Sequence, residues 1–175
     1  MIRVRMAVLL LLPVLAATAG CGLLSSAVND FAVSATTKSM EPTIKSGTRL
    51  SMRRTGDDYV PRLGDVVVFE APDGWTDSQS EALRLSRVIG LPGSTVMCCD
   101  AQGRLQVNGK ALHEPYIAAP PASHLRFEVR VPSGRLWVMG DNRHIALDSR
   151  AHRADPGEGT IAVSDVSGVM IPPKR

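Results

Sequence analysis

Short runs of apolar and β-branched residues, each closed by glycine or proline, fill the chain from Thr36 onward. The most distinct run is Val66-Val67-Val68-Phe69, which follows Gly64-Asp65 and is typical of a buried β-strand. The chain contains 15 glycines and 12 prolines, and only 4% of its residues are aromatic. Helical periodicity is weak after the first twenty residues. The pattern therefore predicts an all-β domain with many loops rather than a helix bundle.

Turn residues divide the rest of the sequence into further predicted strands. These strands cover residues 48–54, 83–90, 104–107, 110–112, 127–131 and 135–139, with one or two more within 160–171. Asn108-Gly109 predicts a two-residue hairpin turn, because both positions tolerate a positive φ. Pro132-Ser133-Gly134 predicts a second hairpin, between residues 127–131 and 135–139. A length of 175 residues suits one domain of ordinary size.

The first twenty residues have the features of an export signal. Arg3 and Arg5 precede an apolar run over residues 6–19, which Pro13 interrupts. As a helix this run would be about 21 Å long, whereas a bilayer core of about 30 Å needs around 20 residues. We therefore expect a signal peptide over residues 1–20, a membrane tether over 21–34 and a β domain over 35–172.

Cys21 follows Thr18-Ala19-Gly20, and these four residues resemble a bacterial lipobox. In that motif the cysteine is lipidated and becomes the new N-terminus. The resemblance implies a lipoprotein whose acyl chains on Cys21 hold it at the outer face of the cell membrane. An uncleaved membrane anchor and ordinary secretion are the alternatives.

Charge and cysteine content argue against two kinds of partner. The formal net charge is +3, and no basic stripe with interleaved aromatic residues occurs, so nucleic acid is not an expected partner. Apart from Cys98 and Cys99 there is no Cys or His pair at a ligand-like spacing, so neither a metal nor another cofactor is predicted. The adjacent cysteines are expected to be thiols in a strand. A disulfide between them is the alternative in an oxidising compartment.

Four segments, in this order, resemble the type I signal peptidases, which are membrane-bound serine endopeptidases that cut leader peptides from exported proteins. The segments are Ser39-Met40-Glu41-Pro42-Thr43, Gly64-Asp65-Val66-Val67-Val68-Phe69, Arg87-Val88-Ile89-Gly90-Leu91-Pro92-Gly93, and Gly140-Asp141-Asn142-Arg143 with Asp148-Ser149-Arg150. The resemblance covers about residues 33 to 171. It implies an antiparallel β-sheet or partial barrel with hairpin insertions, and extended signal peptides of preproteins as partners.

The resemblance also implies roles for residues around the first segment. Ser39 matches the family nucleophile, whose hydroxyl must lose its proton to a base. The backbone N–H of Ser39 and the hydroxyl of Thr37 match the groups that would hold the oxyanion. Met40 and Ile44 match residues that line the pocket for the small side chain beside the scissile bond.

The position of the catalytic base departs from the family pattern. In bacterial members a lysine, kept neutral by burial, precedes the arginine of the third segment. Here that position is Ser86, and the serine that often supports the lysine is replaced by Ala146. Arg87, Asp148 and Arg150 still match a charge cluster that braces the catalytic loop.

Three other basic residues lie near these segments. Lys38 adjoins Ser39, but neighbouring side chains of an extended segment point to opposite faces, so a solvated charge is expected. His144 lies on the loop that the family places near the base, and histidine can act as a base, although an exposed loop histidine is the simpler interpretation. Arg84 is unsuitable, because a guanidinium group stays protonated.

Two functions remain open. The first is a serine endopeptidase that cleaves exported preproteins through Ser39, favoured by the complete first segment. The second is a relative without catalytic activity that binds signal peptides by strand addition or regulates an active signal peptidase paralogue. Ser86 together with Ala146 favours this second function. Loss of the base would remove most of the rate enhancement, about 10³–10⁶-fold by analogy with catalytic triads.

Overall fold

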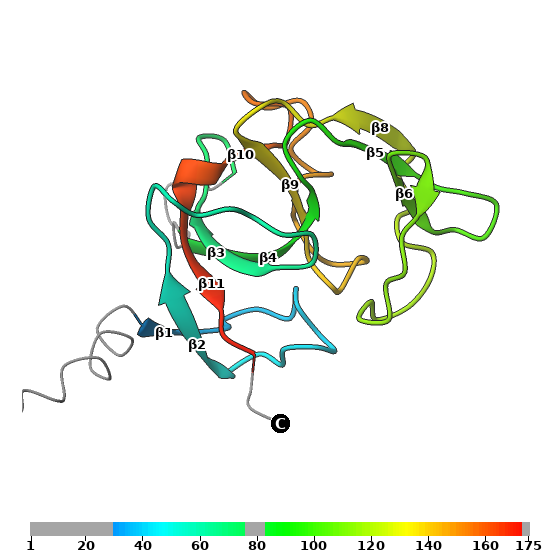
Figure 1. Ribbon diagram of the computed structural model, residues 1–175. Helices are drawn as coiled ribbons and strands as arrows, with labels where there is room; N and C mark the ends of the chain where they lie inside the picture. The colour runs from blue at the N-terminus through cyan, green and yellow to red at the C-terminus, as the bar shows by residue number, and fades with distance from the viewer. Residues whose placement is uncertain (1–29, 76–82, 173–175) are drawn as a thin grey trace, which may run out of the picture.

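The computed structural model of the protein describes residues 30–75 and 83–172. Within these ranges it contains eleven strands and one short 3₁₀-helix, Val163–Asp165. The strands form two antiparallel sheets, one of seven strands and one of four, with the smaller sheet projecting to one side (Figure 1). The all-β fold predicted from the sequence is therefore confirmed.

The larger sheet combines strands from both ends of the described chain. In spatial order they are β1 (Asp30–Ser34), β2 (Arg49–Arg54), β11 (Val166–Met170), β3 (Val66–Glu70), β4 (Leu83–Gly90), β9 (Arg135–Met139) and β10 (Ile161–Ala162). The register shifts between Val166 and Gly168 of β11, and between Val88 and Gly90 of β4. Such irregularities bend the strands that carry them.

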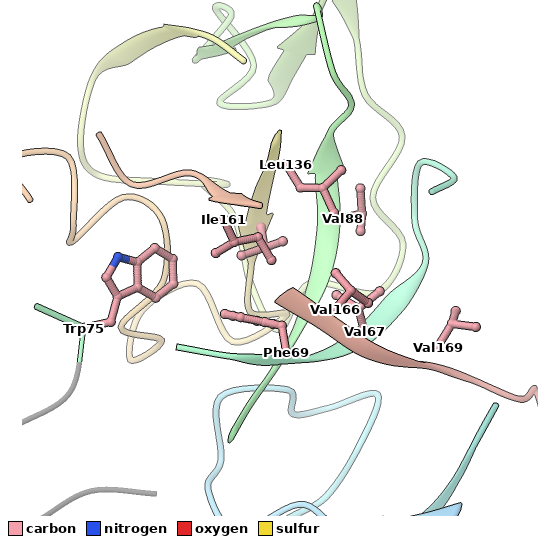
Figure 2. Close-up of a cluster of buried hydrophobic side chains, with 9 residues drawn as sticks. Val67, Phe69, Trp75, Val88, Leu136, Ile161, Val166 and Val169 are labelled. Atoms are coloured by element: carbon pink, nitrogen blue, oxygen red, sulfur yellow. The ribbon is translucent and has the colours of Figure 1, made fainter. Parts of the chain in front are cut away.

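One face of the larger sheet buries the main hydrophobic core (Figure 2). The apolar run Val66–Phe69 becomes β3, which is paired on both sides, with β11 and with β4. Val67 and Phe69 are fully buried, and the indole of Trp75 meets the Phe69 ring edge-on at 6.0 Å. The other members of this core are Val88, Leu136, Val138, Ile161, Val166 and Val169.

The smaller sheet has the order β7 (Lys110–Ala111), β6 (Leu105–Val107), β5 (Thr95–Cys98) and β8 (Phe127–Arg130). Asn108 and Gly109 join β6 to β7 with φ values of 51° and 75°. Both values lie in the left-handed region that a two-residue hairpin of this kind requires. The predicted hairpin at this position is confirmed.

The second predicted hairpin, at residues 132–134, is wrong. Strands β8 and β9 follow each other in sequence, but β8 pairs with β5 in the smaller sheet and β9 pairs with β4 in the larger one. The Val131 N–H donates to Ser94 O at 2.8 Å, and the Gly93 N–H donates to Val131 O at 2.9 Å. These bonds continue the β5–β8 pairing, so the turn leads from one sheet to the other.

The two sheets share a second hydrophobic core where β4 passes β5. Phe127 of the smaller sheet lies against Trp137 of the larger, with ring centroids 5.3 Å apart. A Cβ atom on Gly90 would lie within 2.9 Å of side-chain atoms of Val96, Val131 and Trp137. Glycine at position 90 therefore permits the close approach that joins the sheets.

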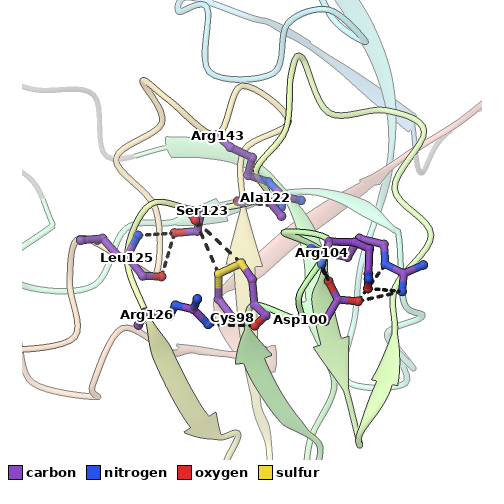
Figure 3. The surroundings of a disulfide bond; sticks show 10 residues. Cys98, Asp100, Arg104, Ala122, Ser123, Leu125, Arg126 and Arg143 are labelled. Carbon is purple, nitrogen blue, oxygen red and sulfur yellow. Dashed lines mark hydrogen bonds and ion pairs between the residues drawn. A yellow bond between two sulfur atoms is a disulfide. The ribbon is translucent and has the colours of Figure 1, made fainter.

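Cys98 and Cys99 form a disulfide at the end of β5 (Figure 3). This is the alternative to the pair of free thiols expected from the sequence. The Arg126 guanidinium donates to the carbonyl oxygen of Cys99 at 3.0 Å, and an Asp100–Arg104 ion pair at 2.8 Å follows the bridge along the chain. The disulfide thus lies on the smaller sheet, beside the segment that leads into β8.

The structure moves the predicted start of the β domain. Asp30–Ser34 lies within the range expected for the tether, yet it forms β1 and pairs along its length with β2. Phe31 contributes to this pairing, since its ring lies 4.8 Å from the Arg54 guanidinium. The predicted signal peptide and Cys21 lie outside the described residues. Within residues 30–75 and 83–172, no helix has the length and apolar character needed to cross a membrane.

Candidate active site

Ser39 lies in a tight turn that is held by the buried side chain next to it. Met40 is 1% exposed and packs with Ala35, Ile44 and Val66. The Ile44 N–H donates to Met40 O at 2.9 Å and closes the turn. Burial of Met40 fixes the backbone while Ser39 stays partly exposed. Ile44 itself is 4% exposed behind Met40, so it supports the turn from within the core.

Thr37 and Ser39 lie together, as the sequence predicted. Their hydroxyl oxygens are 3.0 Å apart, and the Ser39 N–H donates to Thr37 Oγ1 at 3.4 Å. The two expected oxyanion donors, the Ser39 N–H and the Thr37 hydroxyl, therefore lie side by side. A carbonyl oxygen that enters between them could accept from both, provided the Thr37 hydroxyl turns toward it.

A cavity of about 670 Å³ opens beside Ser39. Residues 33–40, 83–86, 145 and 147, together with Val68, form its lining. It therefore brings together four of the residues expected from the sequence: Thr37, Ser39, Met40 and Ser86. Ile44 is not part of the lining. Leu83, Ile145 and Leu147 present exposed apolar side chains to it, which suits an apolar ligand.

The cavity is bordered by backbone that could pair with a ligand. Residues 83–86 of β4 pair with β3, whereas the pairing of β4 with β9 begins only at Arg87. Within the described residues, this stretch therefore has a strand neighbour on one edge only. Val33 and Ser34 of β1 line the same cavity. An extended peptide lying here could add its backbone to the free edge of β4, a common mode of peptide recognition.

Ser86, which the sequence resemblance matches to the family's base, is 7% exposed. Among the described residues, no amine or imidazole forms a hydrogen bond with the Ser39 hydroxyl, whose partner is Thr37. Lys38 is exposed, as the sequence predicted, but it also lines the cavity. His144 does not line it; its Nδ1 lies 3.1 Å from Nε2 of His124. Of the two residues considered as substitutes for the base, only Lys38 therefore lines the cavity beside Ser39.

Arg87, Asp148 and Arg150 do not form the single charge cluster expected from the sequence. The Arg87 guanidinium donates to both carboxylate oxygens of Asp141, at 2.7 and 2.6 Å. Asp148 pairs instead with Arg150, at 2.8 and 2.7 Å, and also accepts from the Gly140 N–H at 3.0 Å. Two separate bidentate pairs therefore hold the loop of residues 140–150, one near its start and one near its end.

Asp141 and two further buried charges were missed by the sequence analysis. Arg143 has a fully buried side chain and pairs with Glu114 at 2.6 Å. It also donates to Gly140 O at 2.8 Å and to Ala122 O at 3.3 Å. Asp141 and Arg143 belong to the fourth segment of the family resemblance, and this membership could have marked them as structurally important. Glu114 lies in no such segment, and nothing in the sequence distinguishes it.

The loop of residues 140–150 contacts the turn of Ser39 directly. The Asn142 N–H donates to Ser39 O at 2.9 Å, and the Asn142 side chain donates to Lys38 O at 3.3 Å. A Cβ atom on Gly140 would lie 2.6 Å from Ser39 O and 2.6 Å from the Cβ of Ala146. The backbone of the loop therefore supports the turn of Ser39, and the close approach of the two segments depends on glycine at position 140.

The family model described as signal peptidase, peptidase S26, matches residues 3–172. The chain belongs to the S26 signal peptidase family. A probable signal peptidase I of Mycobacterium leprae is 34% identical to it over 195 residues, covering 79% of this chain and 67% of the relative. A signal peptidase I of Mycobacterium tuberculosis (strain ATCC 25618 / H37Rv) is 35% identical over 188 residues, covering 79% and 64%.

A further relative and a solved structure that are similar to this S26 member are also signal peptidases I by name. A probable signal peptidase I-2 of Synechocystis is 40% identical over 112 residues, covering 63% of this chain and 50% of the relative. The chain thus spans between one half and two thirds of the length of these relatives. The crystal structure of a signal peptidase I from Enterococcus faecalis V583 matches with a TM-score of 0.50 and 28% identity, covering 65% of this chain and 98% of that one. The family recognised from the sequence is confirmed.

Proposed function

We propose that this S26 member is a serine endopeptidase of the signal peptidase I type, which cleaves the signal peptides of exported preproteins through Ser39. One observation carries the proposal: Ser39 and Thr37 line an apolar cavity of about 670 Å³ with a free strand edge beside it. An extended peptide in this cavity would bring its scissile carbonyl to the nucleophile and to the two oxyanion donors.

The reaction would proceed through an acyl-enzyme. Ser39 Oγ attacks the carbonyl carbon while its proton passes to a base, and the negative oxygen is held by the Ser39 N–H and the Thr37 hydroxyl. The leaving amine takes the proton, and the mature protein departs. Water then hydrolyses the ester on Ser39 and releases the signal peptide. Support for this pathway lies in the 3.0 Å separation of the two hydroxyl oxygens.

Lys38 is the candidate for the base, because it is one of the residues that line the cavity beside Ser39. In the free protein the residue is exposed. A peptide lying along Leu83, Ile145 and Leu147 would exclude water from the cavity. Desolvation disfavours the charged form of an amine, so substrate binding would promote proton acceptance.

A second candidate function is peptide binding without cleavage. Ser86 supports it, since this nearly buried hydroxyl stands where the family has its lysine. The cavity and its free strand edge would be unchanged, so the protein would bind signal peptides, or regulate an active signal peptidase paralogue that shares these ligands.

A cleavage assay distinguishes the two functions. The full chain in detergent is incubated with a purified preprotein, as wild type and as Ser39→Ala, Lys38→Met and Lys38→Arg variants. The peptidase proposal predicts cleavage by the wild type and by none of these three variants; Lys38→Arg is included because arginine retains the charge but cannot accept a proton. Lys45→Met serves as a control, since Lys45 is exposed and outside the cavity lining. If the wild type and every variant bind the preprotein without cleaving it, the second function is established.

We further propose that the protein acts at the outer face of the cell membrane, held by a lipid on Cys21. The lipobox-like residues 18–21 support this anchor. Cell fractionation tests it: Cys21→Ser should move the protein from the membrane to the soluble fraction after signal removal. A Cys21→Ser variant that stays with the membrane would exclude lipidation as the anchor.

A further inference from the structure

The imidazoles of His124 and His144 lie against each other on the surface, and neither residue lines the cavity of Ser39. Nε2 of His124 and Nδ1 of His144 are 3.1 Å apart, and the ring centroids are 5.0 Å apart. Both residues are exposed. The pair joins two segments far apart in sequence: His124 precedes β8 of the smaller sheet, and His144 belongs to the loop that supports Ser39.

We propose that His124 and His144 form a surface site for a divalent transition-metal ion such as Zn²⁺ or Ni²⁺. Imidazole nitrogen is a preferred ligand of these ions. Two nitrogens bound to one tetrahedral zinc at 2.0–2.1 Å lie about 3.3 Å from each other. The observed separation of 3.1 Å is close to this value. For both facing nitrogens to bind the ion, the hydrogen that the rings now share would move to the other nitrogen of its own ring, and the ion would lie to one side of the line between the two nitrogens.

The backbone around both histidines is held in place. Ser123 is 7% exposed, and its hydroxyl donates to Leu125 O at 3.1 Å and accepts from the Leu125 N–H at 3.0 Å, which fixes the backbone on each side of His124 (Figure 3). Arg143, immediately before His144, has a fully buried side chain. The rings can therefore turn toward a shared ion while the backbone stays fixed, which lowers the entropic cost of binding.

The coordination would be completed by solvent. No cluster of three or more potential metal ligands exists in residues 30–75 and 83–172. An ion on the two histidines would keep positions for water, as surface sites with few protein ligands do. The site was not expected from the sequence, because the two histidines are 20 positions apart and match no ligand spacing.

A bound ion would tie the smaller sheet to the loop behind Ser39. Arg143 already links these parts through Glu114 and the carbonyl of Ala122. The histidine pair lies beside this link on the surface, so a metal would add a second connection. Metal binding would therefore stabilise the folded protein in proportion to the logarithm of the metal concentration above the Kd.

Calorimetric titration of the full untagged chain in detergent with ZnCl₂ or NiCl₂ tests the proposal. The wild type should bind one ion per chain. His124→Ala and His144→Ala should each weaken binding by more than about tenfold, since even second-shell changes cost roughly 10–100-fold in metal affinity. His113→Ala is the matched control, because His113 is also an exposed histidine and is not a member of the pair.

Thermal unfolding gives a second readout that is independent of peptidase activity. Zinc should raise the Tm of the wild type and of His113→Ala, but not that of either pair variant, whose Tm without metal should equal that of the wild type. Absence of binding by the wild type would overturn the proposal. So would equal affinity in the wild type and both pair variants, which would locate the metal elsewhere on the chain.

Discussion

The backbone N–H of Asn142 donates a hydrogen bond to the carbonyl oxygen of Ser39 at 2.9 Å. Through this bond Ser39, the proposed nucleophile, is positioned by a segment more than a hundred residues away in the sequence. The same segment is held in turn by two buried ion pairs, Arg87–Asp141 and Asp148–Arg150. The geometry of the candidate active site therefore depends on residues that do not line its cavity. Substitutions of these residues test that dependence.

We expect Gly140→Ala to disturb the turn of Ser39. The new methyl group would lie 2.6 Å from Ser39 O, and that oxygen belongs to backbone that cannot move aside freely. Overpacking of this kind costs about 1–3 kcal/mol. Thermal unfolding should show the loss, and binding of a signal peptide should weaken. Gly56→Ala is the control, because its methyl group would meet only the carboxylate oxygen of Asp58, at 3.3 Å.

We expect Asp141→Ala to destabilise the protein strongly. Asp141 is fully buried, and the variant would leave the Arg87 guanidinium, which is 10% exposed, without its partner. Breaking a buried pair in this way costs about 3–5 kcal/mol. Denaturant titration measures the change. Arg104→Ala, which breaks the more exposed Asp100–Arg104 pair, should leave the unfolding midpoint nearly unchanged. Similar losses in both variants would contradict this account.

We expect Ser86→Lys to increase cleavage of a preprotein. A lysine at this nearly buried position would have little contact with water, which disfavours its ammonium form and allows it to accept the proton of Ser39. If the wild type lacks a base, as the second candidate function requires, the rate should rise by about 10³-fold or more; if Lys38 already serves as the base, the increase should be much smaller. The rate should also increase with pH, as the amine loses its proton. Ser86→Met, of similar length but without an amine, should give no increase.

We expect stability to fall at alkaline pH because of the two tyrosines. Burial, followed by a hydrogen bond to Asp65, raises the pKa of Tyr59; burial and the charge of Glu114 raise the pKa of Tyr116. Both groups keep their protons longer in the folded than in the unfolded protein. The contribution of the two tyrosines to the free energy of unfolding is complete below the pKa of about 10 that tyrosine has in the unfolded chain. This contribution is lost as the pH rises above that value.

Denaturant titrations between pH 8 and pH 11 measure this loss. Tyr59→Phe and Tyr116→Phe should each reduce the slope above pH 10, and the double variant should remove the tyrosine contribution entirely, because the chain has only two tyrosines. An unchanged slope in the double variant would assign the alkaline loss of stability to other groups.

The sequence predicted the parts of the fold that depend on local pattern. The apolar run of β3, the bounds of β4 and the Asn108-Gly109 turn follow from neighbouring residues alone. The pairing of β8 with β5 depends on hydrogen bonds between Val131 and Ser94, which are distant in sequence, and no local pattern indicates them. Edge strand β1 was also missed, since its mixed composition resembles that of a linker.

The same division applies to the candidate site. Ser39, Thr37 and Ser86 were placed by motifs, and the structure brings them to one cavity. The sequence analysis grouped Arg87 with Asp148 and Arg150 and did not consider Asp141, although Asp141 and Asp148 both belong to the fourth segment. Only the fold shows that each aspartate has its own arginine.

Strand β1 ends at the cavity, with Val33 and Ser34 in the lining, and begins at Asp30. Cys21 lies nine positions earlier, a stretch that can extend no further than about 30 Å at 3.3–3.6 Å per residue. If acyl chains hold Cys21, the height of Ser39 above the lipid surface has an upper limit set by these few residues. The peptide bonds of a preprotein that Ser39 could reach would then be limited to those close to the bilayer surface, whatever the sequence around them.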